Sequence, residues 1–439
     1  MLDIRRIKEH PEEVERQLKT RDPSITLKGV VVADERRRRV LGEVETLRSR
    51  QNEASKQIGT MRQRGEDPAE LMREMQEASR WLRDREAELR EAEGALDAEM
   101  AMLPNIPHHS VPVSLNPNEK VVVRERGTKR AFDFAFKNHV QLGADLGILD
   151  FERGAKIAGS QFPMYVGMGA RLEWALINFM LDVHVHEHGY TPVIPPYLVN
   201  TATMFTSGNL PKFADQLYTC QDDDLYVIPT SEVPMTSIYR DEILNEEILP
   251  LYFTAYTACF RREAGTYGAK ERGLVRVHQF NKVEMYKFTT EGASYDELEQ
   301  LVTDAEDIVR RLGLHYRTVL LVTGDIGQQA AKTYDIEVYL PGQEEYKEVS
   351  SCSNCEDYQA RRGNIRYRPK GGGRPKFVHT LNGSGVATSR LMISLLENYQ
   401  EPDGGVVIPD VLVPYMHGIR QIGKKSSDEF HVSRWGVEG

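Results

Sequence analysis

The chain has 439 residues, of which 40% are hydrophobic and 28% are charged, and its formal net charge is −10. This composition is typical of a globular protein with length for two or more domains, and the acidic balance argues against a protein that coats nucleic acid indiscriminately. The N-terminus is charged from its third residue, and no apolar run approaches the roughly 18 residues of a membrane helix, so we expect no membrane segments. Four cysteines are too few for a framework of disulfide bonds in a chain of this length, so we expect a cytosolic protein.

Two heptad patterns come first along the chain. Apolar residues step by four and three over 40–61 and again over 71–96, with only Gln51 and Arg85 interrupting the stripes. Between them the run RQRGEDPAE holds a glycine that can end one helix and an Asp-Pro pair that can start the next. We predict an antiparallel two-helix coiled coil with arms of roughly 30 residues, about 45 Å long at 1.5 Å per residue.

Basic side chains are concentrated on the first of these helices, with a run of arginines from position 36 and more basic residues further along. One interpretation is a solvated coiled-coil surface whose charges pair within the rod. The other is a flank that grips RNA phosphates. The candidate RNA contacts are Arg36, Arg37, Arg38 and Arg50.

A stretch with four prolines, residues 102–117, predicts the linker at which the heptads stop. Residues 169–189 then carry an apolar stripe of helical period and run into the proline-bearing strand GYTPVIPPYLV. Only His184 and His188 share a helical face there, and no cysteine or further carboxylate is spaced to complete a metal site. We therefore expect surface histidines at these positions. The next segment, IPTSEVPMT, predicts a polar turn by itself.

Residues 259–286, CFRREAGTYGAKERGLVRVHQFNKVEMY, predict two extended segments joined by a Gly-rich charged loop. From residue 275 onward apolar side chains alternate with charged or ring-bearing ones, as in a strand with one face on the core and the other on a cleft. Arg261 and Glu263 are two residues apart, hence on one face. Antiparallel pairing would collect arginines, carboxylates and a phenyl ring over one surface, which suits a nucleotide and an amino acid together. The alternative is a solvated hairpin with paired charges.

Two blocks follow toward the C-terminus. In YKEVSSCSNCEDY, Glu348 and Ser351 supply hard oxygen ligands for a Mg²⁺ that keeps most of its waters and is completed by triphosphate oxygens. The CxxC in this block has only isolated cysteines elsewhere to complete a site, so we expect no zinc.

In HTLNGSGVATSRLMISLLENY, residues 382–385 predict a tight turn, with a helix after it in which Arg390 lies near the start. A cation there suits a triphosphate. The alternative is a buried arginine satisfied by backbone carbonyls. No P-loop or dinucleotide-binding motif occurs.

The FRxE signature of class II aminoacyl-tRNA synthetases is matched by Phe260, Arg261, Arg262 and Glu263. The continuation RGLVRVHQFNKVE resembles the bacterial-type seryl-tRNA synthetase version, and the resemblance covers nearly the whole chain. It implies an α+β fold in which an antiparallel β-sheet is flanked by helices, a coiled-coil arm, and a cytoplasmic homodimer formed through the helix at 169–189 and its strand. The implied domains are a tRNA-binding helical arm at 1–105, a class II catalytic domain at 106–422, and a tail without regular structure at 423–439.

The same resemblance implies site residues. ATP is expected at Arg261, Arg262, Glu263, Arg276, Val277, Phe280, Glu348, Val349, Ser350, Ser351 and Arg390. Serine is expected at Thr230, Ser231, Glu232, Arg261, Glu284, Asn382 and Ser384. The implied catalytic residues are Arg261, Glu263 and Arg390, with Glu348 and Ser351 as the Mg²⁺ ligands. The arginines at 36, 37, 38 and 50 become tRNA contacts, because the family's helical hairpin embraces the long variable arm of tRNA.

The implied reaction is the ATP-dependent activation of L-serine to seryl-adenylate, followed by transfer of the seryl group to tRNA(Ser) and, as this family can, to tRNA(Sec). In it Arg261 binds the α-phosphate, Glu263 reads the adenine amino group and Phe280 stacks on adenine. Arg390 reaches the γ-phosphate. The alternative is a serine-adenylating paralogue that acts on a carrier protein or in a specialised pathway, but such a protein has no use for the heptad rod.

Overall fold

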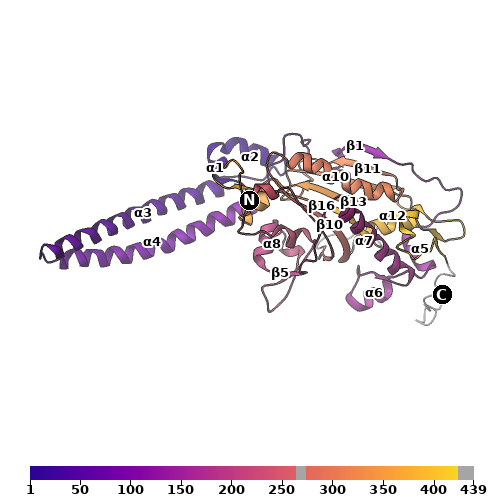
Figure 1. Ribbon diagram of the computed structural model, residues 1–439, viewed down its shortest axis with the longest axis horizontal. Coiled ribbons are helices and arrows are strands. Elements are labelled where there is room, and N and C mark those ends of the chain that lie inside the picture. Colours follow the sequence, from indigo (N-terminus) through magenta and orange to yellow (C-terminus); the bar gives the residue numbers. More distant parts are fainter. Residues whose placement is uncertain (264–272, 424–439) are drawn as a thin grey trace. The chain divides into compact units, whose positions relative to one another are not determined.

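The protein is described by a computed structural model that covers residues 1–263 and 273–423 (Figure 1). Residues 2–104 form one compact unit, and residue 105 begins the other. Most of the predicted Gly-rich loop and all but the first residue of the predicted tail lie outside the described residues. Within the described ranges, no helix has the length and apolar content needed to cross a bilayer.

The first unit is a long helical hairpin preceded by two short helices (Figure 1). The helices are α1 Ile4–Glu9, α2 Pro11–Lys19, α3 Lys28–Gln63 and α4 Ala69–Met102. The chain reverses at Gly65, whose φ of 73° is accessible to a residue without a side chain. Pro68 is the N-cap residue of α4, and Asp67 before it accepts a hydrogen bond at Oδ1 from the N–H of Ala69 (2.9 Å). The predicted antiparallel coiled-coil arm is confirmed.

The two residues that interrupt the heptads pair across the seam between α3 and α4. Gln51 Nε2 donates to Ser79 Oγ (3.0 Å), and Arg85 Nη1 lies 3.5 Å from Glu43 Oε2. At the base of the hairpin the seam becomes a core of buried apolar side chains that includes Val44. Polar pairs inside such a seam fix the register of the two helices at some cost in stability.

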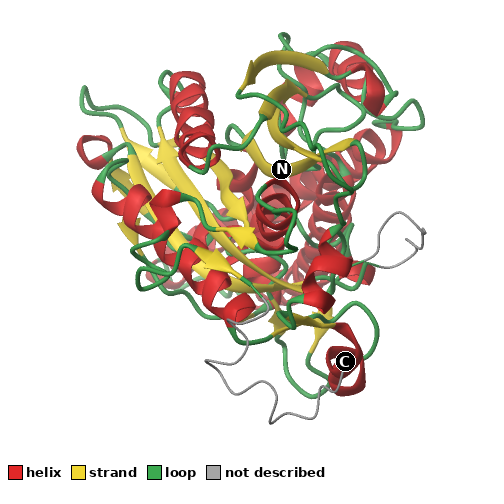
Figure 2. Cartoon of the chain, turned by 90° about the vertical axis from the view of Figure 1, so that its right-hand side faces the viewer, coloured by secondary structure: helices red, strands yellow, loops and turns green. Residues whose placement is uncertain are grey.

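The second unit is built on an eight-stranded sheet (Figure 2). The strand order is β1-β11-β12-β13-β16-β10-β9-β4, and every pair is antiparallel except β4 with β9. The strands are β1 Val121–Arg126, β4 Thr191–Pro192, β9 Leu251–Phe260, β10 Gln279–Thr289, β11 Tyr316–Leu320, β12 Lys332–Leu340, β13 Glu345–Asn354 and β16 His379–Ala387. The predicted antiparallel sheet is confirmed.

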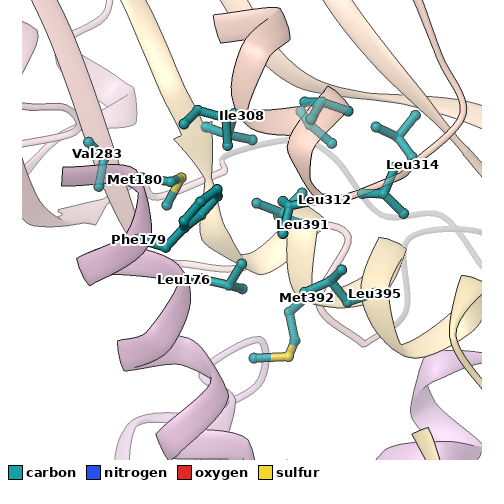
Figure 3. Packing of buried hydrophobic residues seen from close by; sticks show 14 of the residues in the cluster. Leu176, Phe179, Met180, Val283, Ile308, Leu312, Leu314, Leu391, Met392 and Leu395 are labelled. Atoms are coloured by element: carbon teal, nitrogen blue, oxygen red, sulfur yellow. The ribbon is translucent and has the colours of Figure 1, made fainter. Parts of the chain in front are cut away.

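The main core lies between this sheet and its longer helices. These are α7 Met168–His186, α10 Ser294–Arg311 and α12 Thr388–Asn398. Figure 3 shows part of the cluster, to which Phe179 of α7, Ile308 of α10 and Leu391 of α12 belong. Val283 of β10 joins the same cluster. Because side chains alternate along a strand, the residues on either side of Val283 point to the opposite face of the sheet.

Shorter elements surround the sheet. The helices are α5 His139–Asp145, α6 Phe151–Ala158, α8 Thr201–Ser207, α9 Glu232–Thr236 and α11 Tyr358–Arg362. The small sheets contain β2 Leu149–Asp150 with β3 Met164–Tyr165, β5 Leu198–Val199 with β7 Tyr226–Val227 and β6 Tyr218–Thr219, β8 Ile243–Asn245 with β14 Arg366–Arg368 and β15 Lys376–Phe377, and β17 Val406–Val407 with β18 Gln421–Ile422.

The prediction of a tight turn at 382–385 is wrong, because these residues are the centre of strand β16. Gly383 pairs with Met285 on one side and with Cys352 on the other. A Cβ on Gly383 would lie 2.9 Å from the Cys352 sulfur, and one on Gly385 would lie 2.6 Å from Nε2 of His184. The glycines therefore allow neighbouring side chains to approach the strand, and they do not mark a chain reversal.

The prediction of surface histidines near the end of α7 is right for His186, which is exposed, and wrong for His184. His184 is fully buried, and burial lowers the pKa of its ring to about 3, so the ring is neutral. Its Nδ1 lies 3.0 Å from Nδ1 of His188, whose Nε2 lies 3.2 Å from Asp307 Oδ2. No group of three or more His, Cys, Asp or Glu side chains among the described residues could hold a metal ion.

Candidate active site

A hollow lies beside the first half of β10, and the three predicted catalytic residues line it. The predicted site residues in its lining are Arg261, Glu263, Arg276, Val277, Phe280, Glu348, Ser384 and Arg390. They come from the segment after β9, the segment before β10, β10 itself, β13, β16 and α12. Antiparallel pairing of β9 with β10, Phe260 opposite Gln279, brings the first of these segments together as the sequence predicted.

The alternating segment begins its strand later than predicted. β10 starts at Gln279, and the preceding residues form turns held by contacts outside the sheet. The His278 N–H donates to the carbonyl of Gln161 (3.0 Å), and the Leu274 N–H donates to Nε2 of His139 (3.2 Å). Arg276 and Val277 therefore reach the hollow from a loop and not from a pleated strand.

Arg261 and Glu263 reach the hollow in a similar way, because β9 ends at Phe260. The Arg261 Nε–H donates to the carbonyl of Pro229 (3.3 Å), and its guanidinium lies 5.1 Å from the centroid of the Phe280 ring. Glu263 has a positive φ of 47°, and its Oε2 accepts a hydrogen bond from Arg276 Nη1 (3.0 Å). This end of the hollow presents an aromatic face, guanidinium forks and a carboxylate, which together suit a nucleotide.

Glu284 marks the second end of the site, where it is fully buried beside Thr230. Thr230 Oγ1 donates to Glu284 Oε2 (3.1 Å), and the Nζ of Lys282 forms an ion pair with the same oxygen. Glu284 Oε1 is buried and has no hydrogen-bond partner within residues 1–263 and 273–423. Ser384, which lines the hollow, pairs with Glu284 across the β10-β16 ladder. A buried carboxylate oxygen without a partner is costly, so this end is ready for a ligand that donates hydrogen bonds.

Glu232, at the start of α9, is a second buried carboxylate close to Glu284. It accepts a set of hydrogen bonds that the sequence did not predict. Its Oε1 accepts hydrogen bonds from Gln359 Nε2 (2.7 Å) and Gln329 Nε2 (3.1 Å), and its Oε2 accepts one from Asn382 Nδ2 (3.3 Å). Burial, and then the charge of Glu284, raise the pKa of Glu232 to about 7. The two glutamines lie 97 and 127 residues from Glu232 in sequence, and no local pattern marks them.

Arg390 and Glu348 form the third part of the site. Arg390 Nη1 donates to Oε2 of Glu348 (2.9 Å) and to its carbonyl oxygen (2.8 Å). The alternative interpretation of Arg390 as an arginine that satisfies a backbone carbonyl holds in part. The residue also lines the hollow, where a triphosphate contact stays a prediction. Burial opposes ionisation of Glu348, but the neighbouring guanidinium outweighs it and keeps the pKa of this carboxyl below its usual value.

The residues around Glu348 fit a hard divalent cation. Asp335 faces Ser351 across the β12-β13 ladder, and its Oδ1 is buried without a hydrogen-bond partner among the described residues. Burial, followed by the charge of Glu348, raises the pKa of Asp335 well above its usual value. Carboxylate and hydroxyl oxygens beside an unsatisfied acid suit Mg²⁺, which takes few protein ligands and completes its shell with water and phosphate.

Nine of the residues predicted to bind ATP or serine are not in the lining of the hollow; five of them, Thr230, Glu232, Glu284, Asn382 and Ser351, are described above, and the other four lie as follows. Val349 is buried in the main core, on the opposite face of β13 from Glu348, and the hydroxyl of Ser350 donates to the carbonyl of Ser384 (2.5 Å). The backbone of Arg262 bonds to Gln216, and its side chain is exposed. Ser231 is fully buried, as the residue that precedes α9.

On the arm, three of the four predicted arginines already have acidic partners. Arg37 and Arg38 lie 2.9 Å and 2.8 Å from the carboxylate of Asp34, and Arg36 lies 3.1 Å from Glu91. Arg50 is exposed and has no ion-pair partner in the described part of the chain. The paired-charge interpretation therefore applies to the first three, and Arg50 is open to an anion.

Comparisons with known proteins relate both units of the chain to tRNA synthetases. Residues 1–107 match the family described as the seryl-tRNA synthetase N-terminal domain, and residues 218–399 match the tRNA synthetase class II core domain (G, H, P, S and T). A serine–tRNA ligase of Desulforapulum autotrophicum is 50% identical over 418 residues, 95% of this chain and 98% of that protein. One of Desulforamulus reducens is 52% identical over 422 residues, 96% of this chain and 100% of that protein. A crystal structure of seryl-tRNA synthetase from Pyrococcus horikoshii complexed with ATP has a TM-score of 0.89 and 39% identity, covering 96% of this chain and 99% of that one.

Proposed function

Because this chain belongs to the seryl-tRNA synthetase family, we propose that the hollow beside β10 is the place where it joins L-serine to AMP. The protein activates serine with ATP to seryl-adenylate and transfers the seryl group to tRNA. The match of residues 1–107 to the family's N-terminal domain favours tRNA over a carrier protein as the acceptor. The assays are serine-dependent ATP–pyrophosphate exchange and charging of tRNA(Ser), with tRNA(Sec) and a carrier protein as further acceptors in the same experiment.

The observation that carries the site assignment is the convergence of Arg261, Arg276 and Arg390 on one hollow beside Phe280. Three guanidinium groups suit the charge and geometry of a triphosphate, and a phenyl ring suits the face of a base. These residues are separated by up to 129 positions in sequence. A solvated hairpin would give no reason for them to converge.

The first step needs no covalent intermediate with the protein. The carboxylate oxygen of serine attacks the α-phosphorus of ATP, the bond from that phosphorus to the bridging oxygen breaks, and pyrophosphate leaves with the electron pair. Arg261 and Arg390 stabilise the charge that develops on the phosphoryl oxygens, while Phe280 and Glu263 orient the base. In the second step the terminal ribose hydroxyl of tRNA attacks the carbonyl carbon of the adenylate and releases AMP.

Glu284 and Thr230 are the proposed ligands of the ammonium and hydroxyl groups of serine, with Ser384 beside them. The open Oε1 of Glu284 supports this role, because it is a buried acceptor that serine can satisfy. A site that hydrogen-bonds a hydroxyl rejects an analogue without it by about 10⁴ or more, since the buried partners are left unpaired. Alanine should therefore be a poor substrate in the exchange assay.

Serine binding is expected to strengthen as pH rises from about 6 to about 8. The pKa of Glu232 is raised to about 7, so this carboxyl is largely protonated below that pH and becomes an anion above it. An anion close to the serine pocket favours the substrate ammonium, so the KM for serine should fall several-fold over this range. E232Q keeps the shape but cannot ionise, and its KM should vary much less with pH. An equal pH dependence in E232Q would assign the titration to another group.

Glu348 and Ser351 are the proposed ligands of Mg²⁺, which would neutralise triphosphate oxygens when bound. E348Q should raise the Mg²⁺ concentration needed for half-maximal exchange by about tenfold or more, because an amide is a weaker ligand than a carboxylate. E345Q is the matched control, since Glu345 lies on the same strand but pairs with Lys347 outside the hollow (3.0 Å). An equal Mg²⁺ requirement in E348Q and wild type would remove Glu348 from the metal site.

The remaining assignments concern partners. We propose that Arg50 and its flank of the arm contact tRNA, that the protein works in the cytosol where its substrates are found, and that it is a homodimer. Trp174 of α7 and Ile194 after β4 support the dimer, because they are 64% and 91% exposed apolar side chains on the motif expected to form the interface. Sedimentation equilibrium of the wild type and of I194D tests this proposal, and a monomeric wild type would contradict it.

A further inference from the structure

A buried lysine of strand β10, Lys282, lines the hollow. Neither the sequence analysis nor the family resemblance assigns a role to this residue. Lys282 is 6% exposed and lines the hollow together with Arg261 and Ser384. Its side chain lies on the same face of the strand as Glu284, two residues on, and its ammonium pairs with Glu284 Oε2. The Lys282 ammonium is therefore paired with Glu284, the carboxylate that we propose binds the ammonium of serine.

The two oxygens of Glu284 differ in what they bind. Oε2 is taken by Lys282 and by the hydroxyl of Thr230, whereas Oε1 has no partner among the described residues. Serine brings two donor groups, an ammonium and a hydroxyl, and the carboxylate has one open oxygen. The open oxygen can accept hydrogen bonds from both groups, but the serine ammonium would then share one buried carboxylate with the Lys282 ammonium, and two like charges so close repel each other, so serine binding favours the departure of Lys282.

The surroundings explain why an internal cation is needed in the empty site. Glu284 and Glu232 are both buried, and an unpaired buried carboxylate is strongly disfavoured. The charge of Lys282 also helps to lower the pKa of Glu348, which lies on the side of the hollow proposed for the triphosphate. Lys282 thus lies between the serine end and the phosphate end, where the reacting carboxylate and the α-phosphate must meet.

We propose that Lys282 is a placeholder cation: it neutralises Glu284 in the empty site and, when the serine ammonium replaces it, turns to the α-phosphate and becomes a catalytic residue. This inference rests on the proposed function of the hollow. The bonds that form and break are those of adenylation already described. Lys282 keeps its proton throughout and contributes charge stabilisation only.

The test uses K282M in the full-length protein, with serine-dependent exchange and with calorimetric binding of ethanolamine in the absence of ATP. Ethanolamine carries the ammonium and hydroxyl of serine without its carboxylate. In the wild type it displaces Lys282 while no phosphate is present to receive it, so its affinity is reduced by that cost. K282M should bind ethanolamine about tenfold more tightly than the wild type, because the cost of displacement is removed. The kcat of exchange should fall by about 10², as expected for one lost charge contact.

The matched control is K287M, on the same strand. Lys287 is a fully buried lysine that pairs with Glu297 (2.8 Å) and does not line the hollow. Exchange and ethanolamine binding should both stay within about twofold of the wild type in K287M. If K282M does not fold by thermal unfolding, K282Q keeps a donor beside Glu284 and should show the same two changes.

A lysine that only holds Glu284 in place would behave differently. Its loss would weaken both serine and ethanolamine binding and leave kcat at saturating serine unchanged, and that outcome overturns the proposal. Unaltered exchange in K282M overturns it as well. Absence of serine-dependent exchange in the wild type would instead contradict the proposed function, so the two failures are distinguishable.

Discussion

Replacing Arg261 by alanine is expected to lower serine-dependent ATP–pyrophosphate exchange by about 10³-fold or more, a larger loss than any other single substitution considered for this protein. Its guanidinium stacks on Phe280 at 5.1 Å, bonds to the carbonyl of Pro229 and opens onto the hollow. Arg261 therefore contacts both Phe280, at the end of the site proposed for the nucleotide, and the loop that contains Pro229 and Thr230. Its loss removes charge stabilisation and the positioning of that loop together.

The measurement is kcat and KM for both ATP and serine. We expect the loss mainly in kcat, because interactions made more strongly in the transition state raise kcat. The adjacent Arg262 provides the comparison, since its side chain is exposed and lies outside the lining of the hollow. R262A should cost less than about tenfold. Equal losses in the two variants, or adenylation by R261A at the wild-type rate, would reject the arrangement of the site.

Shortening the helical arm is expected to separate the two half-reactions. Arg48 Nη2 lies 2.7 Å from Glu86 Oε1 across the hairpin, so residues 49–85 can be replaced by a short Gly-Ser turn at a point where α3 and α4 already meet. This keeps the buried base of the hairpin, including Val44 and Ala92. Charging of tRNA(Ser) should fall by about 10³-fold, because the deletion removes the phosphate contacts proposed for Arg50 and its flank of the arm.

Adenylate formation by the shortened protein should stay within about twofold of the wild type, because every residue of the hollow lies in the other unit. R50A in the full-length arm is the milder companion variant, and it should weaken charging several-fold with a smaller salt dependence. R48A removes an arginine that pairs inside the arm and should have little effect on charging. Loss of exchange together with charging would contradict this division between the two units.

The sequence by itself determined the parts of the protein that depend on local order. The heptads at 40–61 and 71–96 predicted the arm, because each apolar stripe finds its partner in the same hairpin. Because the period of a strand is two, the alternation at Val283 and Glu284 predicted that the two side chains point to opposite faces of the sheet, and Val283 is in the main core. The FRxE motif at 260–263 predicted nucleotide contacts, and two of its residues, Arg261 and Glu263, line the hollow.

Tertiary structure alone decided the features that depend on residues far apart in sequence. The Gly-rich residues 382–385 have the composition of a turn, yet they form a strand because β10 and β13 flank them on both sides. His184 is buried by packing, although its local pattern gave it a surface position. Gln329 and Gln359 converge on Glu232 from distant segments, and Thr230 reaches Glu284 across a separation of 54 residues. Local sequence sets the period and the direction of side chains, whereas long-range packing sets their partners, and here the partners determine the chemistry.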